Sequence, residues 1–155
     1  MERSAHAHGT KRTYRLNDTF RATVLTTAKD TDGRYDITDG VMAPFSSTPL
    51  HLHTRYDERF FVVCGSMTIW AGAARVELGP GDFYAVARGT PHVIEAGADG
   101  ARSLNISSPA AFADLVARSG SDADEPLTDA DSTMRFAQLS AALGDVILGP
   151  PGTRP

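Results

Sequence analysis

A chain of 155 residues, of which 41% are hydrophobic, fits one domain in which roughly 70% of the unfolded surface can be buried. Its formal net charge of -4 and scattered Lys and Arg residues provide no basic surface for a phosphate backbone, so we expect no nucleic-acid partner. The single cysteine and the lack of any apolar run near the ~18–20 residues that cross a bilayer favour a cytoplasmic protein without disulfides or membrane contact.

Residues 1–12 are polar and carry no periodic apolar pattern, which predicts a flexible N-terminal arm. The arm contains the pair His6-Ala-His8. No downstream Glu or strand-like segment accompanies this pair, so we interpret it as part of a tail without function.

Residues 13–108 consist of short β-prone segments separated by turn residues, which predicts an all-β barrel or sandwich. Turn signals such as Asp32-Gly33 and Gly79-Pro80-Gly81 stand between the segments. A small barrel of this kind can hold one small ligand. The expected strands are 23–27, 35–43, 50–54, 59–63, 67–71, 74–78, 82–87, 92–95 and 102–106.

In residues 109–149 the short β-prone segments give way to apolar residues at helical spacing. This pattern predicts a C-terminal helical extension, followed by a short tail at 150–155. Ser108 is expected to cap a first helix over 109–119, with proline at its first position and glycine after its last. Apolar residues at helical spacing predict a second helix over 132–143. These two helices are expected to cover the barrel or a partner subunit.

The most informative pattern is a set of four candidate metal ligands, His51, His53, Glu58 and His92. Residues two apart on a strand point to one face, so the first two offer their imidazoles to a single site. Glu58 follows a polar stretch that can turn the chain, which would place it on the neighbouring strand, although Asp57 is an alternative. Three imidazoles and one carboxylate suit a divalent transition metal (Fe, Mn, Ni, Co, Cu or Zn) better than Ca²⁺ or Mg²⁺.

These residues resemble the two motifs of the cupin superfamily, in particular its small single-domain members similar to quercetin 2,3-dioxygenases. His51, His53, Glu58 and Gly65 match the first motif, and Gly81, Gly89 and His92 match the second. The resemblance implies a cupin barrel (double-stranded β-helix or jelly roll) with two C-terminal α-helices, which binds one metal through the four ligands. Phe45, Ala87 and Ala96 stand where the motifs have Gly, Pro and Asn.

The resemblance leaves three functions open because cupins carry many reactions. The first is a dioxygenase acting on a flavonol-like or other enolisable phenolic molecule, in which the metal binds substrate oxygen and dioxygen and Glu58 is both ligand and general base. The second is a redox-neutral polyketide cyclase or isomerase of secondary metabolism that uses Zn as a Lewis acid. The third is a non-catalytic, metal-stabilised small-molecule-binding cupin. A homodimer is also expected from the resemblance.

Cys64 lies between Glu58 and Gly65 in the sequence but is not one of the motif residues. It shares strand parity with Glu58, Phe60 and Val62, and we therefore expect a small buried hydrophobic residue. Tyr56 lies within the ligand segment, and the sequence assigns it no role.

Overall fold

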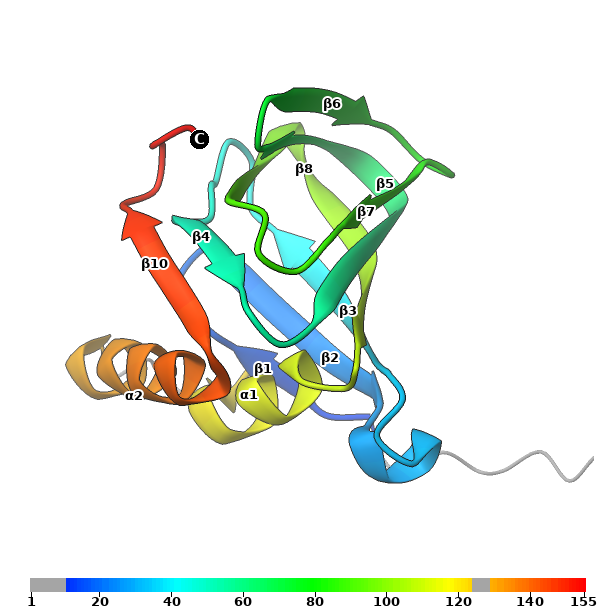
Figure 1. Cartoon of the computed structure of the whole chain (residues 1–155). Coiled ribbons are helices and arrows are strands. Elements are labelled where there is room, and N and C mark those ends of the chain that lie inside the picture. Colours follow the sequence, from blue (N-terminus) through cyan, green and yellow to red (C-terminus); the bar gives the residue numbers. More distant parts are fainter. Residues whose placement is uncertain (1–10, 124–128) are drawn as a thin grey trace, which may run out of the picture.

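The computed structural model describes residues 11–123 and 129–155. Most of the expected N-terminal arm, including His6 and His8, lies outside the described residues. Within them the chain forms one sheet of ten strands and two α-helices. Figure 1 shows that the sheet curves into a barrel with the two α-helices at one end. No helix in this part of the chain has the length and apolar character needed to span a membrane.

The described strands agree with most of the expected segments. In chain order they are β1 (Thr13–Arg15), β2 (Phe20–Thr26), β3 (Asp36–Met42), β4 (Leu50–His53), β5 (Asp57–Ala71), β6 (Ala74–Leu78), β7 (Phe83–Val86), β8 (His92–Ser108), β9 (Ser121–Asp122) and β10 (Asp145–Gly149). The helical elements are the 3-10 helix η1 (Ala28–Thr31) and the α-helices α1 (Phe112–Ser119) and α2 (Asp129–Leu143). The strands β1, β9 and β10 were not expected from the sequence.

Two long antiparallel strands, β5 and β8, organise the sheet. Each was expected as two shorter strands, but the backbone runs through Gly65 in β5 and through Gly97 and Gly100 in β8 without a break in the element. The strand β5 also pairs with β6 and β7, while β8 also pairs with β3 and β4. Apart from β5, β6 and β7, the strands lie side by side in the order β10-β4-β8-β3-β2-β1-β9. The short strand β4 therefore lies between β8 and β10.

The inward face of β5 changes parity part-way along the strand. Phe60 and Val62 are buried before the change, and Met67 and Ile69 are buried after it. The change occurs because the register with β8 shifts between Val62 and Cys64 and again between Gly65 and Met67. Our expectation of a buried Cys64 was therefore wrong, because the irregularity turns this side chain to the exposed face.

The first helix begins later than predicted. Ser108 is still the last residue of β8, paired with Asp57, so it cannot cap a helix that starts at the next residue. The helix α1 starts at Phe112, and the neighbouring strand β3 provides its acceptor: Asp36 Oδ2 accepts hydrogen bonds from the backbone N–H groups of Ala111 at 2.7 Å and Ala113 at 2.9 Å. A buried carboxylate thus takes the place of a local cap.

The C-terminal extension is not purely helical. The helix α2 contacts α1, and the chain then turns at Gly144 into β10, which pairs with β4 in an antiparallel ladder. Gly144 adopts a positive φ of 96°, and a Cβ there would lie 2.5 Å from Thr54 Oγ1, so glycine permits both the turn and its close approach to β4. Residues 145–149 therefore return to the sheet and cover an edge of β4 (Figure 1).

The role of Asp36 can be tested by its replacement. Asp36→Ala is expected to lower the free energy of unfolding by about 1–3 kcal/mol, because two buried N–H groups lose the carboxylate that accepts them. Asp114→Ala is the control: Asp114 lies exposed in the first turn of the same helix and should cost less than about 0.5 kcal/mol. Urea unfolding followed by circular dichroism measures both, and equal losses in the two variants would contradict the capping role.

Candidate metal centre

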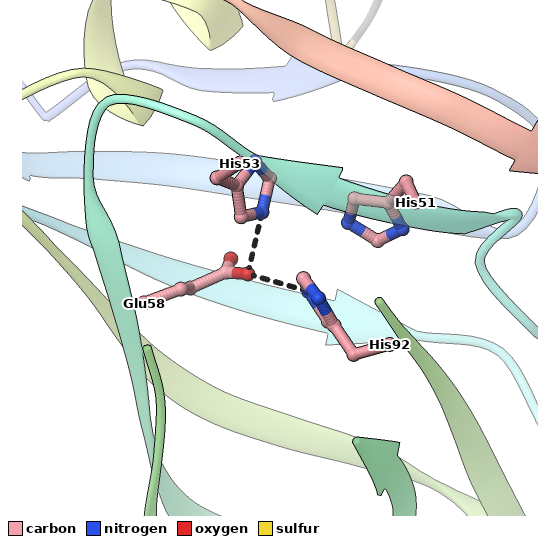
Figure 2. Close-up of side chains that lie close together, drawn as sticks. All are labelled: His51, His53, Glu58 and His92. Atoms are coloured by element: carbon pink, nitrogen blue, oxygen red, sulfur yellow. Dashed lines mark hydrogen bonds and ion pairs between the residues drawn. The ribbon is translucent and has the colours of Figure 1, made fainter. Parts of the chain in front are cut away.

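Three strands bring the four predicted ligands together. The two histidines of β4 point to one side of the strand, and His51 lies directly opposite His92, the first residue of β8, in the antiparallel pairing of the two strands. Glu58, the second residue of β5, enters from the facing side, as Figure 2 shows. Their potential ligand atoms all lie within 4.8 Å of one another. Asp57, the alternative to Glu58, instead bonds Arg88 and is not part of this group.

Glu58 is the centre of the cluster. Its Oε2 lies 3.0 Å from His53 Nε2 and 3.3 Å from His92 Nε2, the two contacts drawn as dashed lines in Figure 2. The ring of His51 completes the group, with its centroid 4.2 Å from that of His92 and 4.9 Å from that of His53. The side chains of His53, Glu58 and His92 are buried, while that of His51 is half-buried.

The three imidazoles are oriented through their outer nitrogens. His51 Nδ1–H donates to the Pro49 carbonyl at 2.7 Å, and His92 Nδ1–H donates to the Thr90 carbonyl at 2.9 Å. His53 Nδ1 is 2.7 Å from the carboxylate of Asp145. A carbonyl or carboxylate oxygen can only accept, so Nδ1 carries the proton in each ring and Nε2 is the nitrogen left for a metal. This donor set fits a transition-metal ion.

The electrostatics of the cluster also suit a bound cation. Burial alone would raise the pKa of Glu58, but the charges and hydrogen bonds of His53 and His92 lower it well below its usual value. Burial alone would lower the pKa of His53, but the carboxylates of Glu58 and Asp145 raise it to about 9. The pKa of His51 falls to about 4 through burial and the neighbouring His92. An ionised Glu58 beside a neutral His51 is a combination that binds metal ions.

A cavity of about 330 Å³ opens onto three of the four ligands, His51, His53 and Glu58. Most of its other lining is apolar and comes from the barrel, from α1 and from α2, including Phe20, Phe60, Phe112, Phe136, Met42, Met67 and Ile94. Ser103 and Asn105, joined by a hydrogen bond of 2.6 Å, add polar groups from β8. A cavity of this size with few polar groups can hold a small, largely apolar molecule.

Two residues of the cluster were not assigned from the sequence. Asp145 holds His53 from the outer side, and Tyr56 stacks on the His53 ring with a centroid distance of 4.2 Å. The three β-prone residues after Asp145, Val146 to Leu148, are a weak strand signal that could have pointed to β10. Nothing in the sequence indicates that this strand pairs with β4.

One departure from the cupin motifs has a structural counterpart. Phe45 stands at the position where the first motif has glycine, and its backbone adopts the left-handed conformation with a φ of 57° that favours glycine. The chain therefore makes the turn that leads towards β4 despite the side chain, which is exposed.

Comparison with known sequences gives a family match for the part of the chain that holds the ligands. A family model described as "Cupin domain" matches residues 40–105. Quercetin 2,3-dioxygenase of Bacillus subtilis (strain 168) is 29% identical over 69 residues, which are 44% of this chain and 20% of that enzyme. The match thus spans a fifth of the length of the curated relative.

Solved structures share the fold at low sequence identity. KdgF from Halomonas sp. has a TM-score of 0.57 at 16% identity and covers 63% of this chain and 86% of its own. Ectoine synthase from P. lautus has a TM-score of 0.58 at 20% identity and covers 74% of this chain and 83% of its own. Residues 40–105 thus match the cupin domain, and the chain has the cupin fold, a jelly-roll barrel, together with two C-terminal α-helices.

Proposed function

We propose that this protein is a metal-dependent cupin dioxygenase that acts on a flavonol-like or other enolisable phenolic molecule. The observation that carries the proposal is the position of the ligand cluster, which opens onto a largely apolar cavity lined by several aromatic side chains. The partial similarity to quercetin 2,3-dioxygenase favours dioxygenase chemistry over the other reactions of cupins.

The ligands in this proposal are Nε2 of His51, His53 and His92 and a carboxylate oxygen of Glu58. A divalent transition metal held there would supply Lewis acidity and a common binding point for a deprotonated substrate oxygen and dioxygen. Glu58 lines the cavity, so its carboxylate is placed to accept the proton of an enolic or phenolic hydroxyl. The apolar walls, among them Phe60 and Met67, would exclude water from the reacting molecule.

Metal binding is the first test of this assignment. The purified chain is expected to bind close to one equivalent of a divalent transition metal, and His51→Ala or His92→Ala should reduce this to near zero, because each removes one of the four proposed ligands. Elemental analysis after dialysis measures the content. Glu95→Gln is the matched control, since Glu95 lies on β8 with His92 but bonds Arg154 away from the cluster. Full metal content in both histidine variants would refute the ligand assignment.

The role of Glu58 is tested by the isosteric change Glu58→Gln. This variant is expected to retain some metal yet lose about 10²- to 10⁴-fold in kcat/KM, because the amide cannot accept the substrate proton. Oxygen uptake with quercetin and simpler flavonols measures turnover, and Glu77→Gln, at an exposed position of β6 paired with Arg75, is the control. A fully active Glu58→Gln variant would show that Glu58 is not the general base.

The same assay distinguishes the alternative functions. A redox-neutral cyclase or isomerase that uses Zn would show tight Zn binding and no oxygen uptake on any phenolic compound. A non-catalytic small-molecule-binding cupin would show binding of a phenolic compound without turnover. Oxygen uptake with Fe, Mn, Ni, Co or Cu in the site would support the dioxygenase.

We also propose that the protein is a cytoplasmic homodimer. Exposed apolar side chains on the outer face of the barrel support a second copy as the partner: Phe61 of β5 pairs with Phe83 of β7, and Val63 lies on the same face of β5. Light scattering should give twice the chain mass, and Phe83→Asp should shift the mass towards that of one chain. A wild-type mass equal to one chain would contradict the dimer.

A further inference from the structure

We infer that Asp145 is a positioning residue for the metal centre, whose carboxylate fixes the ring of His53 through the Nδ1 nitrogen that faces away from Glu58. The inference rests on the proposed metal ligands and adds to them a residue 92 positions away in the chain. By this inference the C-terminal extension contributes a residue to the site, although the extension lies beyond the region matched by the cupin family model.

His53 is oriented differently from the other two histidines. The outer nitrogens of His51 and His92 donate to backbone carbonyls only two residues earlier in the chain, so local backbone geometry orients these rings. The outer nitrogen of His53 instead meets a carboxylate from β10 at 2.7 Å. His53 is therefore the ligand whose orientation depends on the extension.

The carboxylate of Asp145 is itself held in place. Its Oδ2 accepts hydrogen bonds from Ser140 Oγ at 2.6 Å and from the Tyr56 hydroxyl at 3.5 Å. The ring of Tyr56 is nearly parallel to that of His53, at an interplanar angle of 26°. Asp145 thus orients the edge of the His53 imidazole, and Tyr56 covers its face. The side chains of His53, Tyr56 and Asp145 are all buried.

The backbone brings Asp145 to the same place. In the antiparallel pairing of β10 with β4, Asp145 lies directly opposite His53. Hydrogen bonds also hold the turn before β10 against the end of β4. The carbonyl of Gly144 accepts one from the hydroxyl of Thr54 at 2.6 Å and another from the backbone N–H of Thr54 at 3.3 Å. The position of the carboxylate therefore follows from strand pairing and does not depend on a flexible side chain reaching across a gap.

A carboxylate on the outer nitrogen of a ligating histidine has two physical effects. It keeps the proton on Nδ1, which leaves the lone pair of Nε2 directed at the metal, and it increases the basicity of the ligand. Loss of such a partner typically weakens metal affinity about 10- to 100-fold.

We expect a loss of metal affinity of this size for Asp145→Ala. The loss should be smaller for Asp145→Asn, which keeps an accepting oxygen but removes the charge.

The experiment uses the full chain with Co²⁺ alone as the probe. Competition with a chromophoric chelator gives the Co²⁺ dissociation constant, and the visible absorption of bound Co²⁺ reports the geometry of its ligands. Asp145→Ala should raise the dissociation constant about 10- to 100-fold and change the Co²⁺ spectrum. Val146→Ala, at the next and exposed position of β10, is the control and should change neither.

Two further comparisons separate the possible failures. If wild-type protein binds no Co²⁺, or if His51→Ala binds it as tightly as wild type, the proposed metal centre fails. If wild type binds and His51→Ala does not, but Asp145→Ala keeps the wild-type affinity and spectrum, the role of Asp145 alone fails, even if the variant melts at a lower temperature. Should Asp145→Ala not fold, Asp145→Asn decides, and wild-type affinity and spectrum in that variant would overturn the inference.

Discussion

The pairing register of the four-residue strand β4 is the constraint on which the candidate site depends. It sets His51 opposite His92 on one neighbour and His53 opposite Asp145 on the other. Because side chains alternate along a strand, a slip of one residue would turn both imidazoles of β4 away from Glu58. A strand this short cannot define its own register, so the ladders with β8 and β10 must do so.

Charge balance connects the register to the chemistry. Glu58 stands on the inner side of His53, and Asp145 stands on its outer side, so the imidazole lies between two carboxylates. Their charges raise the pKa of His53 despite its burial. A divalent cation bound to Nε2 would replace the proton on that nitrogen and would lie near two negative charges beside a largely apolar cavity. The cluster thus combines two carboxylates, which favour a bound cation, with a largely apolar cavity beside them.

The parts of this site that were predictable from the sequence are those encoded by local spacing. The His51 and His53 pair needs only strand alternation, and the second motif indicates His92, so the cluster and the cupin barrel follow from short patterns. The prediction that Cys64 is buried was wrong because β5 shifts its register with β8 near this residue, and the alternation of apolar residues in the sequence does not indicate such a shift. Asp145 was missed because pairing between β4 and β10 is a long-range choice that burial, not local propensity, decides.

The distance along the chain between His53 and Asp145 has a consequence for synthesis. The ribosome produces residues in order, so β1 to β8 and all four candidate ligands are made before Asp145, the residue that contacts His53 from β10. Until β10 has been made, the edge of β4 that it covers in the complete structure has no strand to pair with. The strand that covers this edge is therefore also the strand that brings Asp145 to His53.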